Sequence, residues 1–389
     1  MSSTFAPSDQ RQRVDIGALA AVCLAGFAFS ANYTNHAPMS GTLREAFHFD
    51  QASAGLLTTG IFLTHFLMQI PGGRLADRFG PARVMPVALV WIALGNLAVA
   101  GAGSYWHLLF WKVFTGLGTG VCFTAGARYT VSSFEGPGLH LAQGFYGGSA
   151  LLGSGFVIFA VPQLLEALGW RGAFICCASV ALLALVVWKL FATPPARTHT
   201  PPGLGGLLTD RQLWVLGMVQ MSSFGLVIVV GSWITTLLRT NFDMPLKLAG
   251  LVGSAVLLLG ILSRPTGGWL LNHLPVKSLL RGALLLSALA CLSLALANSV
   301  AVISIAIVTL GIGCGLPYAA LFNRAAALFP GRAGAAMGLV NMIGITMILA
   351  GAPAMGLVAD LTGQFRVSFL ALAAFALLTA FATAALRES

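Results

Sequence analysis

Long apolar segments recur along the whole chain, and they restrict its fold more than any other feature. Each is about twenty residues long, the length that a helix needs to cross a bilayer. The segments are continuous and rich in Ala and Leu, so alternating transmembrane strands are not expected. They fall near residues 16–36, 52–71, 84–102, 107–129, 141–163, 172–191, 213–236, 248–271, 278–298, 301–322, 334–358 and 367–386. The sequence predicts an all-α membrane protein with twelve transmembrane helices.

The charged residues agree with a membrane protein. Only 8% of the residues are charged, whereas a soluble domain carries about 25%. If the N-terminus is cytoplasmic, fourteen Lys and Arg residues, including Arg11, Arg13 and Arg197, lie on the cytoplasmic side and five on the other. The positive-inside rule therefore predicts that both termini are cytoplasmic. The net charge of +10 fits contact with the anionic leaflet of the lipid bilayer, so it does not indicate a nucleic-acid partner.

The two halves of the chain repeat each other. A shift of 195 residues places Gly73 on Gly268, and a shift of 194 places Gly144 on Gly338. Six helices per half, with both termini on one side, predict a parallel repeat about an axis along the membrane normal. The Pro- and Gly-rich segment 192–212 has no apolar face and is expected to be a cytoplasmic linker. We therefore expect one six-helix bundle over 1–191 and another over 213–389.

A charged segment, IPGGRLADRFGPAR at residues 70–83, interrupts two apolar runs. It resembles the signature between the second and third helices of the major facilitator superfamily. The matching residues are Gly73, Leu75, Ala76, Asp77, Arg78, Gly80 and Arg83. A second signature of that family, in the fourth helix, is matched by Lys112, Gly116, Gly118 and Gly120, with Lys in place of Arg. Helix count, repeat and linker extend the resemblance over essentially the whole chain.

The resemblance implies two halves that rock about a central site and a cytoplasmic gate. Asp77 is expected to cap the N-terminus of a facing helix, where the helix dipole favours an anion. Gly73 and Gly80 would allow tight turns and close helix approach. The remaining candidates for the gate are basic or acidic and would complete a polar cluster: Arg78, Arg83, Arg128 and Glu135. The alternative is that these charges only set the topology.

Ionisable residues inside membrane spans are candidates for function. The predicted spans contain His65, Lys112 and Arg264, and they contain no Asp or Glu. A transporter of organic cations usually needs a buried carboxylate, whereas an uncompensated basic core favours an anion. The alternatives are structural: Arg264 and Lys112 could snorkel to the interface, and His65 could be a satisfied interhelical hydrogen bond. If transport is coupled to protons, His65 is the candidate carrier.

The second half resembles the branch that contains nitrate/nitrite porters and cyanate permeases, on segments such as SRPTGGWLL and FPGRAGAAMGLVNMIG. In that branch the arginine at the position of Arg264 binds the anion. Nitrate porters use a second arginine in helix two, where this chain offers His65 and Gln69. The implied substrate is therefore a small anion, either an inorganic oxyanion or a monocarboxylate. Further candidates for the cavity wall are Asn32, Tyr33, Tyr146, Gln220, Trp233 and Tyr318, although aromatic residues at helical spacing are usually packing.

Other classes of protein fit less well. The antiporter signature of drug exporters is not reproduced in helix five, QGFYGGSALLGSGFVIF, yet a proton-coupled exporter of drug-like compounds stays as the alternative. The six cysteines all fall within spans, and no nucleophile or metal-ligand cluster suggests an enzyme, a metal or another cofactor. The prediction is a monomeric secondary transporter of a bacterial inner membrane, which uses alternating access.

Overall fold

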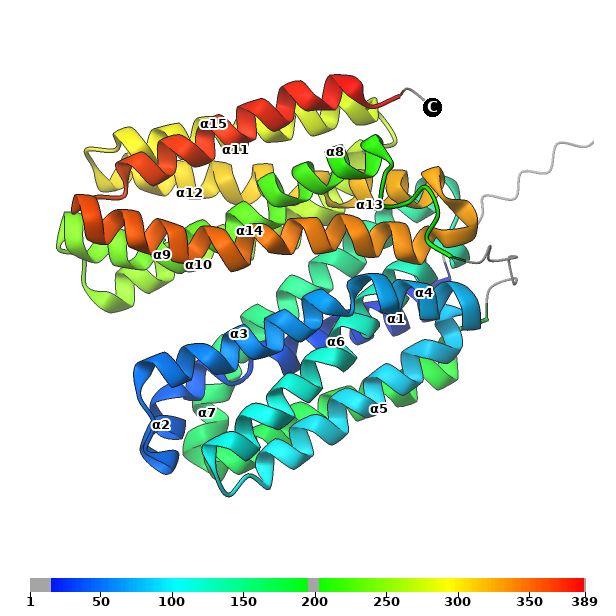
Figure 1. Ribbon diagram of the computed structural model, residues 1–389, viewed down its shortest axis with the longest axis horizontal. Helices are drawn as coiled ribbons and strands as arrows, with labels where there is room; N and C mark the ends of the chain where they lie inside the picture. The colour runs from blue at the N-terminus through cyan, green and yellow to red at the C-terminus, as the bar shows by residue number, and fades with distance from the viewer. Residues whose placement is uncertain (1–14, 195–202, 388–389) are drawn as a thin grey trace, which may run out of the picture.

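The computed structural model describes residues 15–194 and 203–387. Within these ranges every regular element is a helix (Figure 1). Three of the basic residues used to predict the topology, Arg11, Arg13 and Arg197, lie outside the described residues. So does part of the expected linker, residues 195–202.

The first half of the chain contains seven α-helices and one 3₁₀ turn, drawn from blue to green in Figure 1. Their bounds are α1 Ile16–Thr34, η1 Ala37–Met39, α2 Ser40–Phe47, α3 Gln51–Leu67, α4 Gln69–Phe79, α5 Pro81–Ala100, α6 Tyr105–Ser133 and α7 Gly136–Phe191. The short helix α2 was not expected, because its eight residues are too few and too polar to cross a membrane.

The second half lies beside the first and is drawn from green to red in Figure 1. It is built from α8 Arg211–Gln220, η2 Met221–Gly225, α9 Leu226–Phe242, α10 Leu246–Leu270, α11 Val276–Leu296, α12 Val300–Gly315, α13 Pro317–Leu328, η3 Pro330–Arg332, α14 Ala333–Thr362, α15 Arg366–Ala382 and η4 Thr383–Ala385. The π-helical turn η2 joins α8 to α9, so residues Arg211–Phe242 form a single span.

Ten helices in the described part of the chain are long and apolar enough to span a membrane. An eleventh span is the pair α3 and α4, which is bent by 42°. The 56-residue helix α7 is too long for one crossing, and its backbone leaves the helical region at Gly169 (φ 68°, ψ 175°). Counting α7 as two crossings gives the twelve spans that the sequence predicts.

The predicted spans end at residue 71 and begin again at residue 84, which leaves the charged segment as a loop, but in the structure most of it is helical. Helix α4 continues through it to Phe79, and α5 begins at Pro81. Only Gly80, with φ 86°, leaves the helical region, because the reversal between two helices needs a left-handed residue there. Gly73 is not in a turn; it lies inside α4, against the backbone of Gly334. The charges are therefore displayed on a helix end of fixed geometry.

The predicted repeat is visible in how the two halves pack. Gly169 and Gly363, equivalent by a shift of 194, both have positive φ and both end a span. Helix α4 packs against α14, and α10 packs against α7. A Cβ on Gly73 would meet the backbone of Gly334, and a Cβ on its equivalent Gly268 would meet the backbone of His140. A shift of 195 relates Gly73 to Gly268, and a shift of 194 relates His140 to Gly334. The two interfaces therefore repeat one contact.

Candidate functional site

A central cavity of about 460 Å³ lies between the two halves. Nine α-helices and the turns η1 and η2 contribute to its wall, and its polar residues come from both halves. Its lining includes Phe29, Ser30, Tyr33, Phe62, His65, Phe123, Ser154, Gln220, Phe224, Arg264, Tyr318 and Asn341. It also includes Ala37, Ile158 and Ser232, which are exposed. Ala37 follows α1 and precedes α3, so the cavity extends toward the end of the molecule opposite to Asp77, which lies at the end of α4.

Arg264 is the cation of this cavity. It lies in the C-terminal part of α10, just before Pro265, and is 5% exposed. Its Nη1 donates a hydrogen bond of 2.6 Å to the backbone oxygen of Gly147. Its guanidinium carbon lies 4.4 Å from the ring centre of Tyr318 and 5.7 Å from that of Phe224. Within the described residues its Nε has no hydrogen-bond partner, so the guanidinium keeps donor capacity for a ligand.

His65 lines the same cavity from α3. Its ring stacks on Tyr33, with centroids 5.5 Å apart, and its Nδ1 lies 3.0 Å from the Thr119 hydroxyl oxygen. That hydroxyl gives its only proton to the backbone oxygen of Gly116, 2.9 Å away. Nδ1 of His65 must therefore be the donor to Thr119, and the neutral imidazole leaves Nε2 as its acceptor.

A chain of side-chain amides crosses between the halves beside the cavity. Nδ2 of Asn341 donates to Oε1 of Gln69 at 3.0 Å, and Nε2 of Gln220 donates to Oδ1 of Asn341 at 2.9 Å. Nε2 of Gln69 donates to the backbone oxygen of His65 at 3.0 Å. Asn341 and Gln220 line the cavity, whereas Gln69 is fully buried behind them. Gln69 therefore contacts two residues of the cavity wall, the side chain of Asn341 and the backbone of His65, without lining the cavity itself.

Two residues of the cavity wall, Asn341 and Phe224, are not among those predicted from the sequence. Asn341 is an amide in the apolar run of α14, and Phe224 lies in the π-helical turn η2. The polarity of Asn341 within an otherwise apolar span is a signal that could have found it, because unpaired amides are costly in a membrane. No comparable signal distinguishes Phe224 from the other 24 phenylalanines of the chain.

Lys112 lies away from the cavity, inside the first half. Its Nζ donates to the backbone oxygen of Asn32 at 3.0 Å and to Oδ1 of Asn35 at 2.8 Å. Asn35 in turn donates to Asn96 at 2.9 Å. Lys112 and Asn32 are both fully buried. Their surroundings form a polar network that joins α1, α5 and α6.

Two other candidates also lie outside the cavity wall. The hydroxyl of Tyr146 is buried and donates to the backbone oxygen of Phe123 at 2.8 Å. The indole Nε1 of Trp233 donates to the backbone oxygen of Ala352 at 2.9 Å. These contacts hold α7 to α6 and α9 to α14, which is a packing function. Of the ten candidates for the cavity wall, the structure brings five together: Tyr33, His65, Gln220, Arg264 and Tyr318.

The two halves meet at the end of α4 through Asp77. Its Oδ1 accepts a hydrogen bond from the backbone N–H of Gly334, and its Oδ2 accepts one from that of Ala335, both at 2.9 Å. Nε of Arg128, on α6, donates to the same Oδ1 at 2.9 Å. The carboxylate therefore caps the first turn of α14, and the cap and the ion pair are almost entirely buried.

The other residues expected around Asp77 lie at the rim. Arg78 and Arg83 are exposed, and Glu135 precedes the first residue of α7. At the equivalent interface of the second half, Asn272 takes the place of Asp77. Its Oδ1 lies 2.8 Å from Nδ1 of His140 on α7. One interface is thus closed by a carboxylate and the other by a neutral amide and an imidazole.

Twelve spans in two related halves, around a largely apolar cavity that contains Arg264 and is closed at one end, define a membrane transporter. The chain belongs to the Major Facilitator Superfamily, whose family model matches residues 22–344 and, in a second match, residues 218–388. It is a multi-pass protein of the bacterial inner membrane. The second match begins within the second half, in agreement with the internal repeat.

Individual proteins are similar to this chain over most of its length. A probable nitrate/nitrite antiporter of Thermus thermophilus is 24% identical over 341 residues, which cover 78% of this chain and 76% of that protein. A probable sulfoacetate transporter of Cupriavidus necator is 24% identical over 298 residues, which cover 70% of this chain and 69% of that protein. The crystal structure of the transporter FucP in the outward conformation has a TM-score of 0.81 at 17% identity, with 95% and 99% of the two chains covered.

Proposed function

We propose that this protein is a secondary transporter of a small anion and that Arg264 binds the anion. The observation that carries the proposal is the guanidinium of Arg264, which is buried at the cavity wall and has a donor without a partner among the described residues. A cation in a membrane interior is costly unless it is paired. No described carboxylate forms an ion pair with Arg264, so an anionic substrate would complete the pair when it binds.

The lining favours a monocarboxylate or a sulfonate over nitrate. One guanidinium binds one planar carboxylate or one sulfonate through two parallel hydrogen bonds. The aromatic side chains of the wall, among them Phe29, Phe62 and Phe224, would contact an apolar part of the substrate, which nitrate lacks. Both named relatives have names that refer to small anions, nitrate/nitrite and sulfoacetate. Gln69, at the position equivalent to Arg264, supplies no second positive charge.

Alternating access follows from two halves that move against each other. We propose that residues 1–191 and 213–389 are the moving units and that 192–212 links them on the cytoplasmic side. By the positive-inside rule the end of α4 is cytoplasmic, so the closed interface at Asp77 would correspond to an outward-facing state. Asp77 and Arg128 would form the gate, whereas the exposed Arg78, Arg83 and Glu135 would adjust its charge.

His65 is the proposed proton carrier if transport is proton-coupled. Its Nε2 is the acceptor left by the hydrogen bond to Thr119, and its ring lines the cavity beside Tyr33. In proteoliposomes, His65→Gln should remove stimulation of uptake by an imposed proton gradient and should preserve exchange of labelled for unlabelled substrate. Stimulation equal to that of the wild type in this variant would rule out His65.

A thermal-shift series tests the anion proposal directly. The purified protein is heated with acetate, sulfoacetate, nitrate or a cationic drug, since a ligand that binds only the folded state raises its stability. We expect stabilisation by the organic anions, weaker stabilisation in Arg264→Lys and none in Arg264→Ala. The matched control is Arg366→Ala, which removes an exposed arginine at the start of α15.

The size of the effect is set by the loss of a charge-assisted pair. By analogy with buried charge pairs at interfaces, this loss costs about 2–5 kcal/mol of binding free energy. If a cationic drug stabilises the wild type and still stabilises Arg264→Ala, the result would favour the alternative function, a proton-coupled exporter of drug-like compounds. In that case the anion proposal is wrong.

A further inference from the structure

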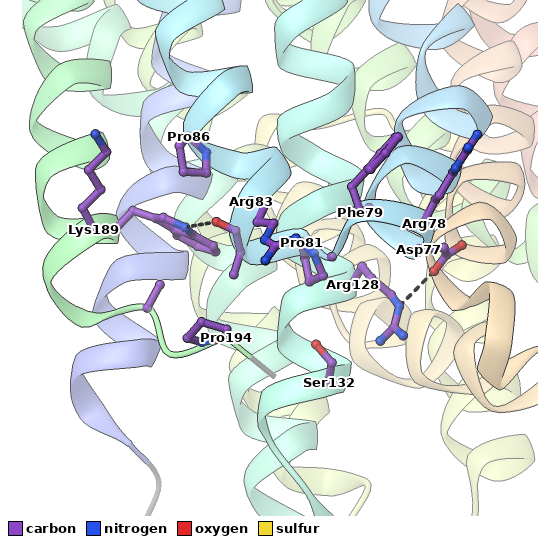
Figure 2. A pocket seen from close by; sticks show the side chains of 15 residues that line it. Asp77, Arg78, Phe79, Pro81, Arg83, Pro86, Arg128, Ser132, Lys189 and Pro194 are labelled. Atoms are coloured by element: carbon purple, nitrogen blue, oxygen red, sulfur yellow. Dashed lines mark hydrogen bonds and ion pairs between the residues drawn. The ribbon is translucent and has the colours of Figure 1, made fainter. Parts of the chain in front are cut away.

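A second cavity, of about 500 Å³, lies at the end of the first half that carries Asp77. It is separate from the central cavity, because the two linings share no residue. Its own lining comes from α4, α5, α6, the end of α7, the turn at Gly80 and the residues that follow α7 (Figure 2). The lining is Ala76–Arg83, Pro86, Arg128, Ser132, Trp188, Lys189, Ala192 and Pro194. The transport function proposed above does not use this cavity as a binding site.

The position of the cavity is the boundary between membrane and water. Gly80 is the turn between two spans, Ser132 lies next to the last residue of α6, and Lys189 lies in the last turn of α7. A ligand in this cavity would therefore be reached both from the lipid interface and from the aqueous side.

The charge of the lining is strongly positive. It contains four basic side chains, Arg78, Arg83, Arg128 and Lys189, and one carboxylate, Asp77. Arg128 is bound to that carboxylate. Within residues 15–194 and 203–387, the side chains of Arg83 and Lys189 make no hydrogen bond or ion pair with the protein. Figure 2 shows Arg83 near the middle of the lining and Lys189 on the neighbouring helix.

The rest of the lining is apolar. Pro81, Ala82 and Pro86 come from the first turns of α5, and Trp188 packs across them with its Nε1 donating to the backbone oxygen of Ala82 at 3.1 Å. Phe79, 50% exposed, adds an aromatic ring to the lining. A site with basic and apolar groups side by side at a membrane boundary fits a ligand that has an anionic head and an acyl-bearing part.

We propose that this cavity binds the phosphate headgroup of an anionic phospholipid, with Arg83 and Lys189 as the residues that contact the phosphate. Ser132 adds a hydroxyl donor to the same lining. Because Arg128 lines the cavity and also pairs with Asp77, the bound phosphate lies next to the cap of α14. A bound lipid would thus change the electrostatic environment of the Asp77 cap at the interface between the halves.

Native mass spectrometry of the detergent-purified full chain tests this site. The probe is dioleoyl phosphatidylglycerol, and the comparison lipid is dioleoyl phosphatidylcholine, which has the same acyl chains and a phosphate but no net charge. The test variant is the double substitution Arg83→Gln and Lys189→Gln. The matched control is Arg211→Gln with Arg366→Gln, which removes two exposed charges outside the cavity.

We expect the wild type and the control to retain phosphatidylglycerol in preference to phosphatidylcholine. In the test variant the retention of phosphatidylglycerol should fall by about fivefold for each removed charge, the factor typical of a basic residue near an anionic surface. Equal retention in the test and control variants overturns the proposal, as does equal retention of the two lipids by the wild type. Competition by free sn-glycerol 3-phosphate at matched concentration would assign the site to a soluble phosphate, against the lipid.

Discussion

Gln69 and Arg264 occupy the same place in the two halves of this transporter. The backbone oxygen of Gln69 faces Gly338, and that of Arg264 faces Gly144, so the helices that carry them pack in the same way. Their side chains differ in what they contact. The Gln69 amide is bonded to Asn341 and buried, whereas the Arg264 guanidinium borders the central cavity. The fold is symmetric, and the charge of the cavity comes from one half alone.

The first prediction concerns the amide pair of Gln69 and Asn341. Gln69→Leu or Asn341→Leu alone leaves a buried amide group without its partner, which costs about 1–3 kcal/mol. The double variant removes both partners, so its loss of stability should be smaller than the sum of the single losses. The measurement is thermal unfolding in detergent, followed by tryptophan fluorescence and analysed as a double-mutant cycle. Strictly additive losses would mean that the two amides do not interact.

The second prediction concerns the close approach of α4 to α14. A Cβ at Gly73 would overlap the backbone of Gly334, which cannot move without separating the helices. Gly73→Ala should therefore destabilise the closed interface by about 1–3 kcal/mol, the usual cost of overpacking. It should lower the melting temperature and impair uptake into proteoliposomes.

Gly282→Ala is the matched control for this substitution. Gly282 lies in α11, and an added Cβ there would meet nothing within 4 Å. This control should be neutral or slightly stabilising, because alanine favours a helix. If both variants have the same melting temperature, close packing at Gly73 does not stabilise the interface between α4 and α14.

Much of the fold is predictable from the sequence because lipid is a demanding solvent. Backbone groups in a bilayer must be satisfied within a helix, so apolar length alone indicates the twelve spans. The half-length shift in the glycines likewise predicts the repeated packing, because Gly73 and Gly268 serve as contact points in both halves. The end of α4 was placed wrongly, since its charges suggested a loop although the chain is helical up to Gly80.

The cavity itself was less predictable. Arg264 and His65 border it and Lys112 does not, although all three are buried basic residues of predicted spans. Which face of a helix points to the partner half depends on rotation about its axis. In a span that is apolar all round, the sequence contains little information on that rotation. For the same reason Tyr146 and Trp233 could not be distinguished from Tyr33 and Tyr318 before the helices were placed.

The third prediction concerns the cap of α14. In Asp77→Asn only one oxygen remains, so the amide nitrogen faces a donor: the N–H of Ala335 if it replaces Oδ2, or the N–H of Gly334 and the guanidinium of Arg128 if it replaces Oδ1. Loss of a helix cap costs about 0.5–2 kcal/mol. Hydrogen–deuterium exchange of the peptide over residues 330–340 should become faster, because one of the two N–H groups, that of Gly334 or that of Ala335, loses its acceptor. Transport should fall while membrane insertion is retained.

The control for the cap is Asp360→Asn, the same substitution at the exposed far end of α14. It should leave exchange over residues 330–340 unchanged. A second comparison is Asn272→Ala at the equivalent interface, which breaks only the contact with His140 and should reduce transport less. Equal loss of transport at Asp77 and Asn272 would contradict an asymmetric gate.

The fourth prediction separates the two buried cations. Lys112 donates to Asn35 and to the backbone of Asn32 inside the first half, away from the lining of the central cavity. Lys112→Met should therefore leave anion-induced stabilisation intact, whereas Arg264→Met should abolish it. Met keeps the length of the side chain and removes the charge. Without ligand, removal of the buried charge should stabilise Lys112→Met, and loss of the hydrogen bond to Asn35 should destabilise it. The ligand-free melting temperature measures the net effect. If Lys112→Met loses the response to organic anions while its ligand-free melting temperature is unchanged, the anion site extends to Lys112 and does not rest on Arg264 alone.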